Sequence, residues 1–229
     1  MRLTALFVLL TALAAVPSAQ SAPPPAPATP APGPAPFLQV FKERRSVRNF
    51  RPDAVPREHL LQILDIARTA PTSGNQQPWK FMVIQDRSRL DALAAATVEA
   101  YAALYQESKK PTEPELAAFR DKYRQVCARY LSAPVFIVIL TDSKSKYPDY
   151  NKWDGPMAAG YLMVAARALG YGTVFCTDSF PFDVVKRVFD IPDRYEVVCT
   201  TPLGVPVEWP AAPPKKALED FVAWERLAE

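Results

Sequence analysis

The chain has 229 residues, 49% of them hydrophobic, and a formal net charge of +3. Its length and hydrophobic fraction are sufficient for one sizeable core, so we expect a single folded domain. A net charge this small argues against nucleic acid as a partner, because proteins that neutralise many phosphates concentrate far more basic residues.

The N-terminal residues 1–22 have the composition of an export signal. Arg2 supplies a positive charge, residues 3–16 form a weakly polar to apolar run, and Ala19 lies among small residues that suit a cleavage site. The run is shorter than the about 20 apolar residues that span a bilayer. We therefore expect an exported protein, periplasmic or secreted. Its first 22 residues are a cleaved signal peptide, a retained membrane anchor, or a fortuitous apolar terminus.

Residues 23–36 form a linker rich in proline and alanine. Eight of the chain's 25 prolines fall in this segment. Proline lacks a backbone donor and the small residues offer little surface to bury, so we expect an extended, solvated spacer. Its simplest role is to tether the folded domain, which we place at residues 37–229. A proline motif that binds a partner is the alternative.

Hydrophobic periodicity predicts helices interleaved with short strands over the rest of the chain. In the first helix, Leu60, Ile63 and Ala67 share one face. Among the strands, the β-branched run 135–140 is expected to be buried on both faces. The predicted helices cover about 56–69, 87–106, 113–131, 154–169, 182–189 and 218–227, and the predicted strands cover 79–84, 135–140, 173–176 and 196–203.

This interleaving predicts an α+β or three-layer fold with helices packed on a central sheet. Asp154 is the expected N-cap of the helix that follows it, and Gly170 is expected to end that helix. Three cysteines, Cys127, Cys176 and Cys199, show no metal-binding spacing. One disulfide could form among them in an oxidising compartment, but Cys176 and Cys199 lie in apolar runs and are expected to be buried thiols.

Several common catalytic arrangements are missing from the sequence. His59 is the only histidine and lies within a predicted helix, so a Ser-His-Asp triad or a histidine-rich metal site is not expected. Gly170 and Gly172 lie where a helix passes into a strand, which is the reverse of the order in a dinucleotide-binding phosphate loop. A phosphorylated cofactor would therefore have to be held by side chains.

Two polar segments are candidates for such a site. Residues 44–50 read RRSVRNF and place three arginines and a serine within five positions, a set that can donate paired hydrogen bonds to a phosphate. Residues 70–79 read APTSGNQQPW, a polar turn closed by a tryptophan. Taken alone, the first segment could equally be a solvated helix end, and the second could be an ordinary connector.

Taken together, the two segments resemble the nitroreductase family of FMN-dependent oxidoreductases. That family opens with Arg-x-Ser-x-Arg/Lys and continues with Ser-x-x-Asn-x-Gln-Pro-Trp. The similarity covers about residues 37–229 and includes further segments in the family's order. The resemblance implies a three-layer α+β fold with a mixed central sheet between helices, in an intertwined homodimer. The further matching segments are DGPMAAG at 154–160, LGYG at 169–172, GVP at 204–206 and KKALE at 215–219.

The resemblance also implies a set of FMN-binding residues. Arg44, Arg45 and Ser46 would hold the phosphate, and Arg48 would face N1 and O2 of the flavin, where a fixed cation favours the reduced, anionic cofactor. One of Lys215 and Lys216 would return to the phosphate. The polar turn would reach the flavin bound mainly by the other subunit, through Pro71, Thr72, Ser73 and Asn75. Trp79 is expected to be a core anchor.

Three further positions carry weaker expectations. The loop 175–180 corresponds to one whose backbone N–H groups point at flavin N5 and O4 in the family, but this chain has no glycine there. Thr177 and Asp178 are the residues that we assign to this role. Gln125, on the predicted helix 113–131, is assigned to the pyrimidine edge of the flavin.

The activity implied by the resemblance is a ping-pong transfer of hydride from NAD(P)H or another donor to a small acceptor such as a nitroaromatic or a quinone. Export creates a tension, because reduced nicotinamide nucleotides are cytosolic. FMN could be acquired outside with electrons from another donor, the N-terminus could be an uncleaved anchor, or the domain could bind flavin or an aromatic ligand without turnover. A flavin-fragmenting or dehalogenating enzyme is a further alternative.

Overall fold

The structure is a computed structural model that describes residues 36–227, which belong to one compact unit. The predicted signal segment, 1–22, and all of the predicted linker 23–36 except Pro36 lie outside the described residues. Within the described part of the chain, no helix has both the length and the apolar character needed to cross a membrane.

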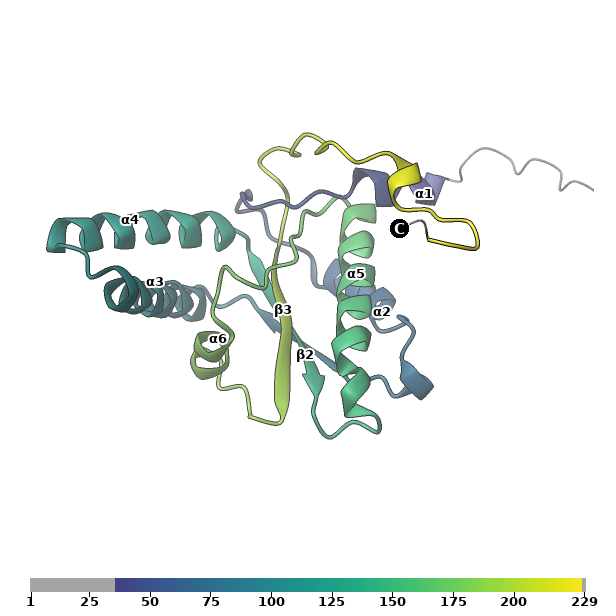
Figure 1. Cartoon of the computed structure of the whole chain (residues 1–229), viewed down its shortest axis with the longest axis horizontal. Coiled ribbons are helices and arrows are strands. Elements are labelled where there is room, and N and C mark those ends of the chain that lie inside the picture. Colours follow the sequence, from purple (N-terminus) through teal and green to yellow (C-terminus); the bar gives the residue numbers. More distant parts are fainter. Residues whose placement is uncertain (1–35, 228–229) are drawn as a thin grey trace, which may run out of the picture. The chain divides into compact units, whose positions relative to one another are not determined.

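A three-stranded antiparallel sheet forms the centre of the unit (Figure 1). The strand β2 (Val135–Asp142) lies between β1 (Trp79–Ile84) and β3 (Tyr195–Leu203). Every residue of β2 except the last is buried, as the sequence predicts for a strand covered on both faces. The prediction of three strands in these positions is therefore confirmed.

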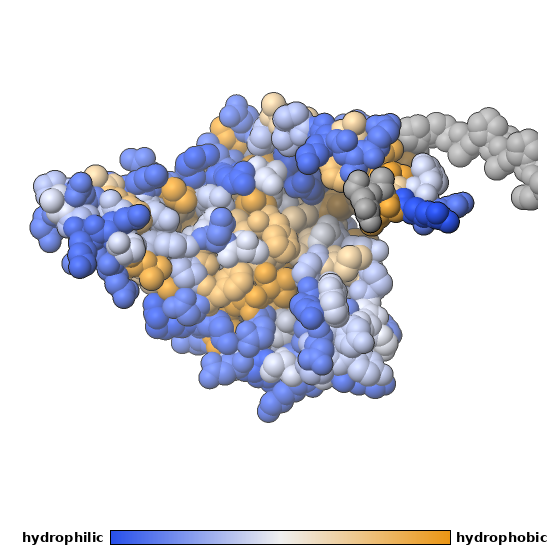
Figure 2. Space-filling model, viewed as in Figure 1, coloured by the Kyte–Doolittle hydropathy of each residue, from blue (hydrophilic) through white to orange (hydrophobic). Residues whose placement is uncertain are grey.

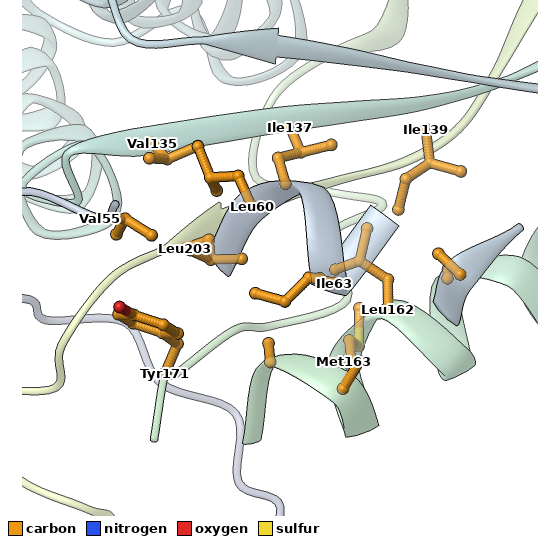
Figure 3. Packing of buried hydrophobic residues seen from close by; sticks show 14 of the residues in the cluster. Val55, Leu60, Ile63, Val135, Ile137, Ile139, Leu162, Met163, Tyr171 and Leu203 are labelled. Atoms are coloured by element: carbon orange, nitrogen blue, oxygen red, sulfur yellow. The ribbon is translucent and has the colours of Figure 1, made fainter. Parts of the chain in front are cut away.

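The two faces of β2 pack against different helices because successive side chains of a strand point to opposite sides. Val135, Ile137 and Ile139 point toward α2 (Arg57–Ala67) and α5 (Asn151–Ala168), as Figure 3 shows. The apolar stripe of α2 lies directly in this layer, which confirms the helix predicted from its periodicity. The helix residues at the centre of the cluster are Leu60, Ile63, Leu162 and Met163.

The other face of the sheet carries a second helical layer. Phe136 and Val138 point into a cluster formed with α3 (Arg87–Lys109), α4 (Glu113–Tyr130) and α6 (Phe182–Val188). The molecule is thus an α+β fold of three layers, helices on both sides of a sheet, as predicted.

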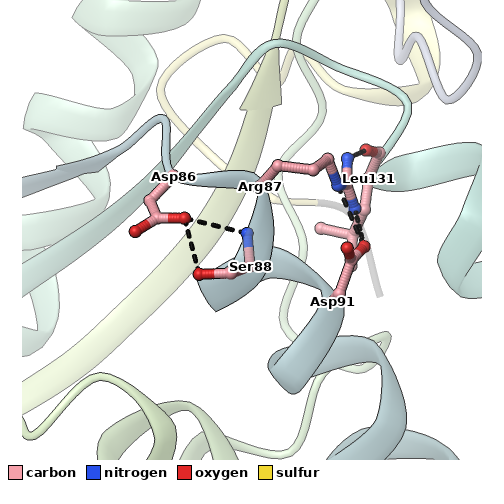
Figure 4. Close-up of polar contacts among 5 residues, drawn as sticks. All are labelled: Asp86, Arg87, Ser88, Asp91 and Leu131. Atoms are coloured by element: carbon pink, nitrogen blue, oxygen red, sulfur yellow. Dashed lines mark hydrogen bonds and ion pairs between the residues drawn. The ribbon is translucent and has the colours of Figure 1, made fainter.

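Polar contacts fix the start of α3 and join it to the end of α4. The Asp86 carboxylate accepts a hydrogen bond of 2.8 Å from the backbone N–H of Ser88, which fixes the first turn of α3 (Figure 4). The guanidinium of Arg87 bonds both to Asp91 and to the carbonyl oxygen of Leu131. This arginine therefore joins the start of α3 to the residue that follows α4.

The remaining elements are short. They are the helix α1 (Pro36–Glu43) and three single turns of 3-10 helix, η1 (Ser73–Asn75), η2 (Pro148–Tyr150) and η3 (Leu218–Asp220).

Asp154 is not the N-cap that its position suggested. The helix α5 begins three residues earlier, at Asn151, and Asp154 lies buried in its first turn. Its carboxylate instead accepts hydrogen bonds from the backbone N–H of Ser73, at 3.1 Å, and from the Gln76 side chain, at 2.7 Å. The predicted end of the helix is confirmed, since Gly170 adopts a φ of 85° directly after it.

The predicted strand 173–176 is not a regular strand. The chain from 172 to 176 makes only isolated bridges, which pair Gly172 with Gly204 and Cys176 with Thr200. A third bridge, between Ser46 and Thr173, is the only parallel pairing among the described residues. The three strands of the sheet pair antiparallel, so they do not form the mixed sheet that the resemblance implies. The two antiparallel bridges to the chain at 200–204 share one register, but no bridge links the positions between them, so no continuous strand forms.

The predicted helix 218–227 is also wrong. Only the turn η3 forms there, and the apolar side chains of the segment are exposed, with Leu218 and Phe221 each at 70% and Trp224 at 87%. Helices of this length depend on packing of their apolar face, and the described residues of this chain supply no surface for it.

Candidate functional site

The basic segment 44–48 follows the end of α1 and pairs with the irregular run 172–176. The Val47 backbone N–H donates to the carbonyl of Thr173 at 3.0 Å, and that of Arg51 donates to the carbonyl of Val205 at 2.8 Å. Val47 is buried, so in this extended backbone its neighbours Ser46 and Arg48 point the other way. The pairing therefore turns the polar side chains of the segment away from the core.

Gly172 allows this segment to lie where it does. A Cβ added at Gly172 would come within 2.7 Å of Val47 Cβ and within 2.9 Å of Pro206 Cγ. Any other residue would push Val47 or Pro206 away, because interior packing leaves no such space. Gly172 thus has a packing role beside the basic segment.

The basic segment lines a cavity of about 570 Å³, which we name the basic cavity. The opposite wall comes from the far end of the chain and includes Lys215. Five of the lining side chains are cationic and none is acidic, so the cavity is suited to an anion. Its lining residues are Phe41, Lys42, Arg44, Arg45, Ser46, Arg48, Pro210, Ala211, Pro213 and Lys215.

The cations of the basic cavity differ in how they are engaged. Arg45 Nη1 donates to the backbone carbonyls of Lys42, at 2.7 Å, and of Arg44, at 2.9 Å. The side chains of Arg44 and Lys215 form no hydrogen bond or ion pair with any residue that the structure describes. Arg44 and Lys215 therefore offer their full donor capacity to an anion, whereas Arg45 also shapes the backbone around it.

Arg48 is held from outside the segment by a residue that the sequence did not point to. Its Nε donates to the Tyr130 hydroxyl at 2.8 Å, and its guanidinium lies 6.0 Å from the centre of that ring. Tyr130 is the last residue of α4, and nothing in its sequence context marks this role. Lys42, a further cation that lines the cavity, was also not among the residues predicted from the sequence. Its place in the chain, three residues before Arg45, is a sequence signal that could have pointed to it.

The polar turn, residues 71–77, is fixed by α5 and lies apart from the basic cavity, whose lining includes none of its residues. Three hydrogen bonds from Ser73 and Gln76 to Asp154 attach the turn to α5, and within the turn the Thr72 hydroxyl accepts a 3.2 Å bond from the Gln77 backbone N–H. Gly74 has a φ of 57° and packs against the ring of Tyr147. Pro71 and Asn75 are exposed, and Trp79 is buried, which confirms its prediction as a core anchor.

The remaining candidate residues do not join the basic cavity. Gln125, Thr177, Asp178 and Lys216 are all exposed, and none of them lines the cavity. The backbone carbonyl of Asp178 accepts a hydrogen bond from the hydroxyl of Tyr101, which reaches it from α3. The loop that contains Thr177 is therefore tied to the α3–α4 layer rather than to the basic segment.

Cysteine chemistry and metal binding find no support in the described residues. Cys127, Cys176 and Cys199 are free and buried, as predicted for the latter two. Burial raises the pKa of the Cys176 thiol to about 12, so near neutral pH it stays protonated and is a poor nucleophile. No group of three or more His, Cys, Asp or Glu side chains that could hold a metal occurs in the part that the structure describes.

Comparison with known proteins yields one family. The model of the nitroreductase family matches residues 41–205. A Methanothermobacter thermautotrophicus protein named as an NADH dehydrogenase/NAD(P)H nitroreductase is 29% identical over 76% of this chain and 78% of its own length. The 5,6-dimethylbenzimidazole synthase of Rhodospirillum rubrum is 29% identical over 74% of this chain and 81% of its own.

A solved structure shares the fold. Iodotyrosine deiodinase bound to FMN and 3-iodo-L-tyrosine superposes with a TM-score of 0.66 and 22% identity, covering 83% of this chain and 99% of that one. The matching proteins thus carry names from three different reactions.

Proposed function

Because the chain belongs to the nitroreductase family, we propose that it is an FMN-dependent oxidoreductase. In this proposal it passes hydride from NAD(P)H or another donor to a small acceptor, such as a nitroaromatic or a quinone, in a ping-pong cycle. When bound, FMN supplies the hydride chemistry at N5. The observation that carries the proposal is the basic cavity, in which residues 44–48 meet Lys215 from the other end of the chain.

The residues of the basic cavity fit the phosphate of FMN. Arg44 can donate a pair of parallel hydrogen bonds, Lys215 adds a mobile point charge, and Ser46 adds a hydroxyl. The lining has no carboxylate to repel a dianion. Protein side chains must do this work, since the chain has no glycine-rich phosphate loop.

Arg48 has a separate role in the proposal, which is to hold positive charge beside the pyrimidine edge of the flavin. The bond from its Nε to the Tyr130 hydroxyl fixes the side chain without neutralising it. A fixed cation stabilises negative charge in a site from which water is excluded.

Replacing Arg48 by alanine is therefore expected to lower the midpoint potential of the bound flavin while FMN remains bound. Each 1.4 kcal/mol of lost stabilisation corresponds to about 30 mV for a two-electron couple. The measurement is a potentiometric titration of the wild type, Arg48→Ala and Arg48→Lys. The lysine variant keeps the charge and should retain most of the wild-type potential, and equal potentials in all three would refute the role.

We also propose that the protein is a homodimer, on the basis of an exposed apolar face of α5. Trp153, Met157 and Tyr161 recur every four residues along this helix and are 57%, 43% and 37% exposed. Between them, a Cβ added at Gly160 would meet nothing within 4 Å, so another backbone could approach closely there. A cavity of about 620 Å³ lies along the same face, lined chiefly by apolar groups and including Val164.

A twofold axis across this face would explain why the two candidate segments are apart in one chain. The polar turn is attached to Asp154 at the start of α5, whereas α1 is attached to the end of the helix, where Glu43 pairs with Arg167 at 2.7 Å. Arg167 follows Asp154 by 13 residues along α5, which separates these points by about 20 Å. Two antiparallel α5 helices would place the turn of one copy beside the basic cavity of the other.

Other exposed apolar groups favour a partner as well. Figure 2 shows apolar surface grouped over the middle of the face presented in Figure 1, with hydrophilic residues along its margins. The apolar side chains of the segment 218–227 are also exposed. Contiguous apolar surface of this kind marks an interface or a ligand site.

The proposed function is tested by purifying the protein and recording its absorption spectrum in the flavin region, before and after anaerobic addition of NADH or NADPH. We expect a yellow protein that bleaches on reduction and recovers its colour on adding a quinone. A colourless protein that cannot be reconstituted with FMN would refute the proposal. A yellow protein that no donor reduces would identify a flavin-binding module, and selective reoxidation by an iodinated phenol would indicate dehalogenation.

A further inference from the structure

Arg167 joins two segments that are far apart in the sequence. It lies in the last turn of α5, and its Nη2 donates to Glu43 Oε2 at 2.7 Å. The face of the same guanidinium stacks on Trp209, with the central carbon 4.2 Å from the ring centroid. Only 22% of its side chain is exposed, so both contacts are partly shielded from water, which strengthens them.

Both partners of Arg167 adjoin walls of the basic cavity. Glu43 is the last residue of α1 and directly precedes Arg44. Trp209 directly precedes Pro210, the first residue of the C-terminal wall, and Lys215 ends that wall. Three of the five residues between Trp209 and Lys215 are prolines, whose fixed φ keeps the connection stiff.

We propose that Arg167 is a positioning residue that holds the two walls of the basic cavity together and so sets the affinity for the FMN phosphate. The inference rests on the proposed function. Arg167 is not in the lining of the cavity, and it acts through Arg44 on one side and Lys215 on the other.

The geometry suits arginine better than lysine. The guanidinium presents one edge to Glu43 while its face lies on Trp209, and a planar group can do both at once. An ammonium group could keep the ion pair with Glu43, but it is a point charge without the planar surface that arginine places on the indole ring. Arg167→Lys should therefore hold α1 and release the C-terminal wall.

The test measures dissociation constants for FMN and for riboflavin, which lacks the phosphate. Arg167→Ala is expected to bind FMN about tenfold more weakly, the size of one charge-assisted contact, with riboflavin binding unchanged. In a Lys215→Ala background the Arg167→Ala substitution should weaken FMN binding by a clearly smaller factor, because both residues act on the same contact with the phosphate. The FMN dissociation constant of Arg167→Lys should lie between those of the wild type and Arg167→Ala. The control is Arg120→Ala, which breaks an ion pair with Glu99 between α3 and α4 and should leave both dissociation constants unchanged.

Two results would overturn the inference. One is an equal loss of FMN and riboflavin binding in Arg167→Ala, which indicates general unfolding, and the other is an equal loss with and without Lys215. If the wild type binds neither flavin, the proposed function fails. The contact between Arg167 and Trp209 is then tested without a ligand. Acrylamide quenching of Trp209, obtained by subtracting the Trp209→Phe signal, should then rise in Arg167→Ala, and unchanged quenching would overturn it.

Discussion

Arg44→Ala is expected to weaken FMN binding by about 10- to 150-fold, which corresponds to losing a charge-assisted contact of about 1.5–3 kcal/mol. Arg44 lines the basic cavity, and its guanidinium has no hydrogen bond or ion pair with the described residues, so its donors are free to bind an anion. Its removal therefore costs binding energy without breaking an internal contact. The measurement is the FMN dissociation constant from flavin fluorescence, with riboflavin as the phosphate-free comparison.

Two matched variants sharpen this measurement. Arg68→Ala removes an exposed arginine that pairs with Asp65 on α2, and it should leave FMN binding unchanged. Arg45→Ala removes a side chain that bonds to two backbone carbonyls, so it should lower stability as well as affinity. An unchanged FMN constant in Arg44→Ala, at unchanged stability, would show that the phosphate lies elsewhere.

Met157→Asp is expected to convert the dimer to a monomer and to abolish tight FMN binding. Met157 lies at the centre of the exposed apolar face of α5, and an unpaired carboxylate buried in an interface costs on the order of 3–5 kcal/mol. Because the proposed site needs the polar turn of the second copy, the flavin should be lost with the dimer. The measurements are the mass in solution by light scattering and the flavin content after gel filtration.

The control is Leu104→Asp, a change of the same kind at an apolar side chain on α3 that is 56% exposed. It should leave both the mass and the flavin content unchanged. A Met157→Asp protein that remains a dimer would place the interface on another face. A monomer that binds FMN as tightly as the wild type would contradict the shared site.

The fold was predictable where one face of an element is buried within this chain. The stripe of α2 that contains Leu60 and Ile63 and the continuously apolar β2 give strong local patterns, and both elements were predicted correctly. The segment 218–227 has a similar apolar pattern but no layer of this chain to pack against, so no helix forms. Periodicity shows which face is apolar, but it does not show whether a partner is available to cover that face.

The site was predictable in its residue types and not in its geometry. Arginines beside a serine indicate an anion-binding site. Only the fold brings Lys215 to the same cavity as Arg44. This arrangement depends on long-range contacts, in which residues 46–51 pair with the chain near 173 and 205. Asp154 shows the opposite case, in which a residue with good N-cap chemistry is used for a tertiary contact. The roles of Tyr130 and Arg167 have no local signal, since each depends on a partner more than 80 residues away.

The pairing of the basic segment has a consequence for the order of folding. Just after the segment, Phe50 bridges to Pro206 and Arg51 bonds to Val205, and the basic cavity is closed by Lys215, so these contacts span most of the domain. Contacts between distant residues carry a high cost of loop closure and form late. A ribosome-bound chain that has not yet exposed residue 215 therefore lacks the complete cavity. If FMN binds in this cavity as proposed, we expect it to bind only after synthesis of the domain is finished.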